Sequence, residues 1–209
     1  MKTTSKKGIE LGVAALLLAV LIGATPAAAR TPAQVVEDLA NQVIGVLKNA
    51  ALDAQQKRVE IENIAYGAID FTTLSKLVLA RNWPKFSNDQ RAVFEQEFKQ
   101  HLSMTYGRNI DSYKNEKVAI LGERPESRGD VTVQTKILRG GGVEDVVVDY
   151  RLRQNDGHWK IIDVIIEGVS LVSNFRSQFQ DIVANGGPDR LLTLLRDKNA
   201  AGEPLQKQP

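Results

Sequence analysis

The chain contains 209 residues, of which 43% are hydrophobic, with 27 basic side chains, 25 acidic side chains and no cysteine. The absence of cysteine excludes thiol nucleophiles, thiolate metal ligands and the acylated cysteine of a lipoprotein. A chain of this length supports one domain with a full core, which needs no disulfide even in an oxidising compartment.

Residues 1–29 have the pattern of a cleaved secretory signal peptide. Lys2, Lys6 and Lys7 precede an apolar stretch at residues 11–22, and small residues at 27–29 offer a cleavage site. The apolar stretch is short for a membrane-spanning helix. We therefore expect export across the inner membrane, cleavage after Ala29 and a soluble mature chain.

The charge that remains after this cleavage favours no polyanion as a partner. Residues 1–29 contain three lysines and one glutamate, so the remainder carries equal numbers of basic and acidic side chains. The sequence pI of about 8.8 is largely an effect of the signal peptide. We expect no nucleic acid partner, because general polyanion binding needs a basic surplus.

The first half of the mature chain is predicted to be helical. Thr31 and Pro32 suit the start of a helix that ends near residues 48–49, and a second helix is predicted at residues 53–64. A third begins at Asp70 and ends before Trp83 and Pro84. Residues 87–90 have the form of a capping box and open a long helix. Its predicted buried face comprises Phe94, Phe98, Leu102, Tyr106, Ile110 and Tyr113.

The second half switches to strands, which are predicted at residues 117–121, 130–138, 144–153 and 159–167. Glycine-containing links at residues 140–142 and 155–157 are short, so consecutive strands should form an antiparallel meander. Ser170 can cap a following helix, which residues 185–188 stop before another helix at residues 189–198. The polar tail at residues 199–209 is expected to be disordered.

This order of elements predicts an α+β fold. N-terminal helices, a four-stranded twisted antiparallel sheet and C-terminal helices would enclose an apolar cavity, as in the half-cone sheets of nuclear-transport-factor-2-like folds. We expect a single domain at residues 30–198 that includes a helical subdomain.

The familiar catalytic signatures are absent from the sequence. It contains no HExxH, Walker, dinucleotide-binding or GxSxG motif, and no pattern pairs its two histidines, His101 and His158. Asp163 interrupts an apolar strand and would suit a general base if it were buried in a cavity. The favoured interpretation is that Asp163 pairs with an arginine or a helix terminus. Glu167 at the strand end is likewise expected to cap or to form a salt bridge.

The apolar faces of the last two strands are the remaining feature that could indicate a binding site. Strand periodicity places Val146, Val148, Tyr150 and Leu152 on one face. On the next strand, it places Ile162, Val164 and Ile166 together, with Trp159, Ile161 and Ile165 on the other face. We expect the Phe94 face of the long helix to lie opposite. Periodicity does not decide whether side chains or a ligand fill the space between them.

An ordered set of segments resembles the MlaC (toluene-tolerance) family of periplasmic phospholipid-binding proteins. The segments are DFTTLSKLVLARNW (70–83), SNDQR (87–91), VDYRL (148–152), WKIIDV (159–164), EGVSL (167–171) and NFRSQF (174–179). The last two are the most specific, and the likeness extends over about residues 32–195.

The resemblance implies a periplasmic carrier that shuttles phospholipids between the inner and outer membranes and maintains outer-membrane lipid asymmetry. It implies no enzymatic activity and no cofactor, with bound phospholipid as cargo. The implied partners are the inner-membrane Mla ABC transport complex and the outer-membrane Mla lipoprotein–porin complex, and the carrier is expected to be a monomer. The residues expected to contact the acyl chains are Trp83, Phe94, Phe98, Tyr106, Val146, Val148, Tyr150, Ile162, Val164, Ile166, Val169 and Phe175.

Two alternatives remain open from the residues alone. One is a small periplasmic enzyme that uses Asp163 as a base in its cavity. The other is an adaptor or interaction module without a ligand, whose core is filled by side chains.

Overall fold

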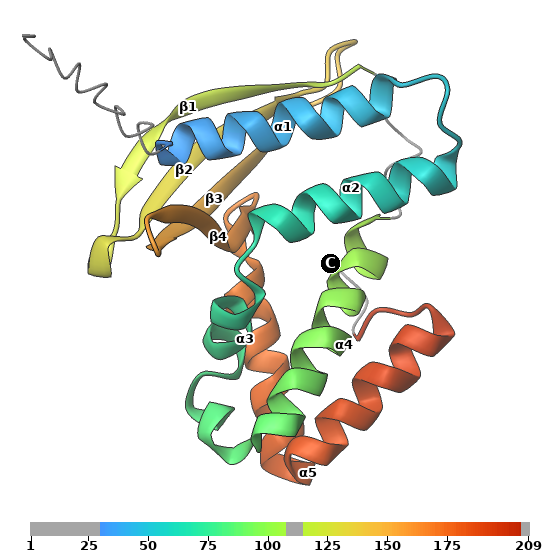
Figure 1. The fold of residues 1–209 in the computed structure, drawn as a ribbon, viewed down its shortest axis with the longest axis vertical. Helices are drawn as coiled ribbons and strands as arrows, with labels where there is room; N and C mark the ends of the chain where they lie inside the picture. The colour runs from blue at the N-terminus through green and yellow to red at the C-terminus, as the bar shows by residue number, and fades with distance from the viewer. Residues whose placement is uncertain (1–29, 108–114, 206–209) are drawn as a thin grey trace, which may run out of the picture.

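The computed structural model describes residues 30–107 and 115–205 (Figure 1). It begins with two antiparallel helices, α1 (Pro32–Lys48) and α2 (Ala54–Ala68). Thr31 and Asp53 cap them, and each cap forms the reciprocal bonds of a capping box with a glutamine three residues later. These short-range caps explain why the helix starts are evident from the sequence.

Three helical segments follow: α3 (Phe71–Leu79), the 3₁₀ helix η1 (Ala80–Lys85) and α4 (Asn88–Tyr106). Asp70 and Ser87 cap α3 and α4 as the sequence predicts. Two members of the predicted buried face of the long helix, Ile110 and Tyr113, lie outside the described residues.

The sheet is an antiparallel meander in the order β1-β2-β3-β4-β5. Its strands are β1 (Lys117–Pro125), β2 (Val131–Leu138), β3 (Val146–Asn155), β4 (His158–Ile166) and the short β5 (Val169–Ser170), with a 3₁₀ turn, η3 (Ser127–Gly129), between the first two. The α+β class is confirmed, although β5 adds a fifth strand. Glu167 and Gly168 make the final turn at φ 49° and 79°, and Glu167 Oε1 accepts a bond from the Val147 amide.

A β-bulge changes the predicted phase of β4. Tyr150 pairs with Val164 but Leu152 pairs with Ile161, so β4 has one extra residue between these pairs. Ile161 therefore shares a face with Val164, and the prediction that placed them on opposite faces is wrong. A bulge shifts the side-chain alternation by one residue, and the strand's own sequence does not reveal where it occurs.

The C-terminal segment is one helix with a sharp break. α5 (Leu171–Ala201) turns at Gly187, whose φ of 72° and ψ of −176° are not helical, and Pro188 starts the second half. The predicted stop at residues 185–188 is therefore present. The sequence predicts disorder from residue 199, whereas Asn199 belongs to α5 and is buried, and Leu205 packs against the helical core. Residues 206–209 lie outside the described residues.

The elements form two regions (Figure 1). α1 lies along the sheet with α2 beside it, and α3, α4 and α5 gather below as a helical bundle. Each region has its own buried cluster. The helical core includes Phe94, Phe98, Phe175 and Phe179, whereas the sheet cluster consists of Val36, Val133, Leu152 and Ile161.

Candidate functional site

The inner face of the sheet, defined here as the face towards α1, is largely apolar. Register aligns Val133, Tyr150 and Val164 in one row. The next row is Thr135, Val148 and Ile166. The predicted contacts Val146, Val148, Tyr150, Val164 and Ile166 thus lie on one continuous surface.

One end of this surface is closed by close packing. Val36 of α1 and Val133, Leu152 and Ile161 of the sheet are each at most 2% exposed. The Ala33 amide donates to Glu123 Oε1 at 2.7 Å, which fixes the start of α1 beside the end of β1. α1 therefore runs towards the opposite end of the sheet, where β1 starts (Figure 1).

The other end is much less tightly packed. Although α1 continues over the sheet there, the apolar residues of both layers are only half-buried. They are Val43, Ile44, Val46 and Leu47 of α1, and Val118, Ile137, Val146 and Ile166 of the sheet. Apolar side chains that face each other without becoming buried indicate a layer that is incompletely filled.

α2 packs beside α1 and contributes no buried residue, even though it carries Ile61 and Ile64. A groove of about 1090 Å³ opens between α1, α2 and the β3–β4 hairpin, beside the closely packed end of the sheet. Its lining combines apolar and polar side chains: Arg30, Val35, Asp38, Leu39, Gln42, Asn63, Ile64, Gly67, Ala68, Gly157, His158, Trp159 and Lys160. This volume slightly exceeds the usual range of about 300–1,000 Å³ for small-molecule sites.

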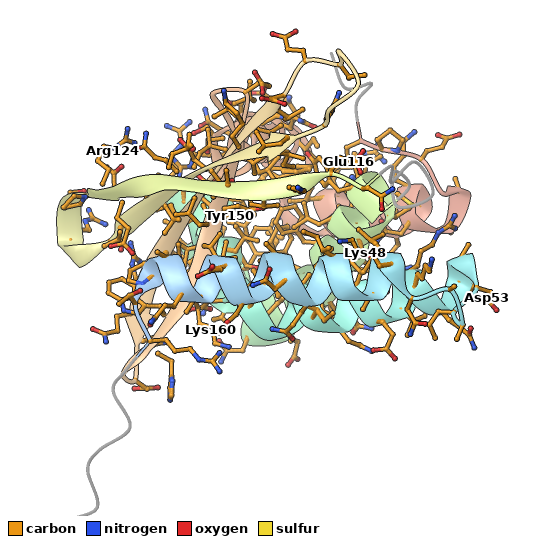
Figure 2. All side chains as sticks on the ribbon, turned by 90° about the horizontal axis from the view of Figure 1, so that it is seen from above. Lys48, Asp53, Glu116, Arg124, Tyr150 and Lys160 are labelled. Carbon is orange, nitrogen blue, oxygen red and sulfur yellow. The ribbon has the colours of Figure 1, made fainter. Side chains whose placement is uncertain are left out.

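Tyr150 lies near the middle of the inner face, between β1 and α1 in the view of Figure 2. Burial raises the pKa of Tyr150 to about 12, so its hydroxyl is neutral at physiological pH. A neutral phenol adds a polar tip to an apolar wall without adding charge.

The aromatic contacts predicted from the helices lie elsewhere. Phe94, Phe98 and Phe175 are at most 3% exposed and belong to the helical core. Their rings stack or meet edge-on with centroids 5.0–5.5 Å apart, and Phe179 completes the group. The Phe94 face of α4 thus packs mainly against α5, and it is α1 that covers the sheet.

The remaining predicted contacts are scattered. Trp83 and Tyr106 are half-buried at the edge of the helical core, with the Arg91 guanidinium 4.9 Å from the Trp83 ring. Ile162 is buried at the bulge and lines an enclosed apolar cavity of about 40 Å³ beside α3 and α4. Val169 is 53% exposed on β5.

Sequence reasoning did not assign the residues of α1 and α2 to this site. The stripe of Val35, Leu39 and Val43 is plain in the sequence at helical spacing. Spacing shows which face of a helix is apolar, but it does not show which element that face covers. The half-buried state of the stripe, which is the informative property, appears only in the folded chain.

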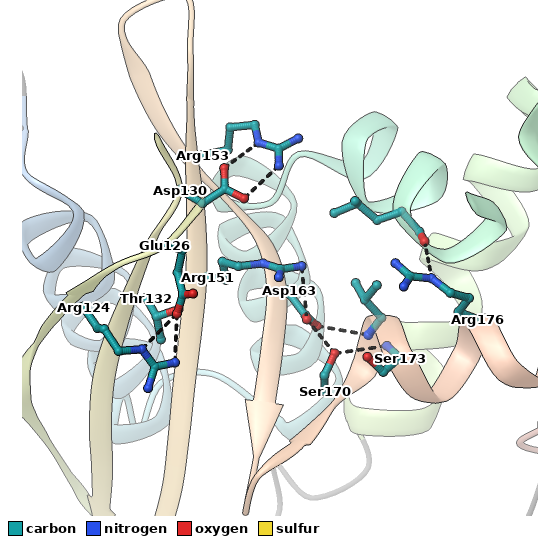
Figure 3. Close-up of polar contacts among 12 residues, drawn as sticks. Arg124, Glu126, Asp130, Thr132, Arg151, Arg153, Asp163, Ser170, Ser173 and Arg176 are labelled. Atoms are coloured by element: carbon teal, nitrogen blue, oxygen red, sulfur yellow. Dashed lines mark hydrogen bonds and ion pairs between the residues drawn. The ribbon is translucent and has the colours of Figure 1, made fainter. Parts of the chain in front are cut away.

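Asp163 caps a helix, as the favoured interpretation has it (Figure 3). Its Oδ1 accepts from the Val172 amide at 3.0 Å and its Oδ2 accepts from the Ser170 hydroxyl at 2.6 Å. Arg151 Nη2 lies 3.6 Å from Oδ2. The carboxylate therefore holds the start of α5 against β4, and it lies apart from the inner face.

A second buried polar group joins the chain end to the helical core. His101 is fully buried, with Nδ1 2.9 Å from Asn199 Oδ1, and its Nε2 accepts from the Leu205 amide at 3.3 Å. Burial lowers the pKa of His101 below its ordinary value. Asn199 in turn donates to the Glu97 carboxylate at 3.0 Å.

The described residues offer neither a metal site nor a membrane span. Within residues 30–107 and 115–205, no three His, Asp or Glu side chains gather where they could hold a metal ion. The same residues contain no helix whose length and apolarity would carry it across a bilayer.

Comparison with known proteins identifies relatives along most of the chain. The chain is 27% identical over 186 residues to the toluene tolerance protein ttg2D of Pseudomonas putida, covering 82% of this chain and 83% of the relative. It is 21% identical over 197 residues to the intermembrane phospholipid transport system binding protein MlaC of Haemophilus influenzae, covering 91% of each.

A solved structure has the same fold. It is a phospholipid-binding protein from Ralstonia solanacearum in complex with a phospholipid, and it matches with a TM-score of 0.72 at 24% identity. The match covers 80% of this chain and 96% of that chain. The family model of the MlaC protein matches residues 37–197. Because that match spans well over half of the sequence, the chain belongs to the MlaC family.

Proposed function

We propose that this protein is a periplasmic phospholipid carrier that shuttles lipid between the inner and outer membranes and so maintains outer-membrane lipid asymmetry. The acyl chains would lie between the inner face of the sheet and the α1–α2 pair. The observation that supports the proposal is the contrast in packing: where β1 starts, most apolar residues of α1 and the sheet face each other yet stay half-buried. In a folded domain, such a surface calls for a ligand or a partner.

The physical chemistry of the cargo favours an enclosed site. Exposing an acyl chain to water costs about 0.8 kcal/mol per methylene, so two chains with some thirty methylenes cost on the order of 20 kcal/mol. A carrier must therefore surround both chains. Transfer from membrane to carrier exchanges one apolar environment for another, so it can be close to neutral and reversible. Direction would then come from partners rather than from the carrier.

The relatives support this choice of cargo and system. One structural neighbour is described as a phospholipid complex, and one relative as the binding protein of an intermembrane phospholipid transport system. We accordingly propose the inner-membrane Mla ABC complex and the outer-membrane Mla lipoprotein–porin complex as exchange partners, with a monomeric carrier cleaved from its signal peptide.

The proposed lining follows the sheet rather than the aromatic helices. Val146, Val148, Tyr150, Val164 and Ile166 would form one wall. Leu39, Val43 and Ile64 would contribute the opposite wall from α1 and α2. The predicted contacts Phe94, Phe98 and Phe175 already fill their own surroundings, so lipid contact there would need α4 and α5 to separate.

Native mass spectrometry of residues 30–209, purified from a bacterial periplasm without detergent, tests the proposal. We expect a stoichiometric mass increment that fragments to a phospholipid, and the same lipid in an organic extract of the sample. A bare mass, with no lipid in the extract and none taken up from liposomes, would contradict a carrier and favour an adaptor.

A further inference from the structure

A polar hollow of about 280 Å³ lies on the outer face of the sheet, where β4 leads through β5 into α5 (Figure 3). It is lined mainly by charged and hydroxyl-bearing side chains, including Arg124, Glu126, Arg151, Asp163 and Arg176. The sheet separates this hollow from the inner face, so the proposed acyl site and this hollow are distinct.

The carboxylates of the hollow are already occupied. Glu126 Oε1 accepts from Arg124 Nε at 3.0 Å, from Arg124 Nη2 at 2.8 Å and from Thr132 Oγ1 at 2.9 Å. Asp163 uses both of its oxygens to hold the start of α5. Two acidic groups are therefore present, but each is engaged with its own partners.

The arginine donors are not matched in the same way. Arg151 Nε is buried and has no hydrogen-bond partner among the described residues. Arg151 Nη2 lies 3.6 Å from Asp163, beyond hydrogen-bond distance. Arg176 Nε donates to the Leu77 carbonyl at 2.9 Å, which anchors the guanidinium at the rim of the hollow. The hollow thus has a surplus of donors over available acceptors.

The net charge of the residues that line the hollow also favours an acidic ligand. Three arginines and two carboxylates line the hollow, which leaves one positive charge uncompensated. Hydrogen bonds from Arg124 and Thr132, together with the charge of Arg151, lower the pKa of Glu126. Asp149 stands two residues before Arg151 on β3, but it does not line the hollow and forms no ion pair with Arg151 among the described residues.

We propose that this hollow binds a carboxylate side chain presented by an acidic segment of a docked partner protein. A planar guanidinium pairs with a carboxylate through two parallel bonds, and the buried Arg151 Nε supplies a donor that lacks its acceptor. A single surplus charge also matches a single carboxylate.

A membrane surface suits the hollow less well. Attraction to anionic lipid depends on several basic residues spread over an exposed face. Here the guanidinium of Arg151 is recessed, with its side chain 30% exposed, and residues 30–209 carry equal numbers of acidic and basic side chains. A recessed guanidinium favours a protruding side chain over a flat surface.

The arginine side-chain Nε–H resonances of isotopically labelled residues 30–209 offer a direct test. The probe is an acetylated and amidated hexaglutamate peptide. We expect a saturable shift of the Arg151 signal and about a tenfold weaker affinity in Arg151→Gln, as for the loss of one charge-assisted bond. Arg151→Lys should recover part of the affinity, because it restores the charge without the planar fork.

Arg139→Gln is the matched control, because it removes the same charge from the exposed β2–β3 link, away from the hollow. It should bind like the wild type, and equal weakening in this variant would overturn the proposal as general charge attraction. A shift caused by inorganic phosphate or by phosphatidylglycerol vesicles, but not by hexaglutamate, would overturn it in favour of a phosphate ligand.

Bound phospholipid measured in the same variants keeps this inference separate from the carrier function. We expect Arg151→Gln to retain the wild-type lipid load while it loses affinity for hexaglutamate. If Arg151→Gln lost its lipid together with the peptide affinity, the hollow would belong to the cargo site and the inference would be wrong.

Discussion

The two buried clusters of this protein differ in how completely they are filled. The helical core brings Phe94, Phe98, Phe175 and Phe179 into direct ring contact with almost no exposure. The layer between the sheet and α1 is closed at one end, and most of its apolar residues beyond that end are half-buried, with Val148 as a buried exception. Both have apolar sequences, so apolarity alone does not separate a structural core from a ligand site. The difference lies in the packing.

Substitution in the filled region should have the largest effect on stability. Phe98→Ala removes a ring that touches three other aromatic rings and should lower the free energy of unfolding by about 3–5 kcal/mol. In the other region, Ile64→Ala should cost less than about 1 kcal/mol in the lipid-free protein, because Ile64 is only half-buried. Urea denaturation of both variants measures the contrast. Equal losses would show that the two regions are packed alike.

Removing the cap of α5 should have an intermediate effect. Asp163→Ala leaves the Val172 amide and the Ser170 hydroxyl without their acceptor, which should cost about 1–3 kcal/mol. Lipid load should be unchanged, since Asp163 lies on the outer side of the sheet. A variant of wild-type stability would contradict the capping role, and a loss of lipid at wild-type stability would contradict the placement.

A smaller, pH-dependent effect should come from His101 in the helical core. Burial lowers the pKa of His101 in the folded state. The neutral imidazole therefore contributes fully to stability above its ordinary pKa of 6.5, and this contribution declines as the pH falls below 6.5. Protonation at Nε2 would also remove the acceptor of the Leu205 amide. Urea denaturation at about pH 7.5 and about pH 5 should show this loss in the wild type and a smaller one in His101→Gln.

The residues around His101 provide a control variant for this pH dependence. Glu97 reaches the histidine only through Asn199, and Glu97 is itself paired with Arg196 at 3.3 Å. Arg196→Gln should therefore change stability by a similar amount at both pH values. If His101→Gln kept the full pH dependence of the wild type, the decline would have to arise from other groups.

Local signals explain what could be predicted from the sequence. Helix starts at Thr31 and Ser87 depend on bonds within three residues, and the link at residues 185–188 stops a helix through its own backbone preferences. The fold class follows from the order of such elements. The bulge at Ile162 cannot be predicted from such local signals, because it depends on how β3 and β4 pair.

The same limit applies to which apolar faces the sequence brings together at the candidate site. Val148 and Tyr150 were assigned to the correct common face, because alternation along one strand is local. Phe94 and Phe98 were expected to face them, yet these residues pack on α5, and α1 covers the sheet. Which apolar faces meet is decided by tertiary packing, and periodicity carries no information about it.

The lipid load of two adjacent substitutions on β3 tests the central claim most directly. Val148 points to the inner face and Val147 to the outer face, so Val148→Glu and Val147→Glu introduce the same charge on opposite sides of one strand. Circular dichroism first establishes that both variants are folded. Native mass spectrometry should then find Val148→Glu largely without phospholipid and Val147→Glu with the wild-type load. Equal lipid in both variants would contradict a cargo site between the sheet and α1.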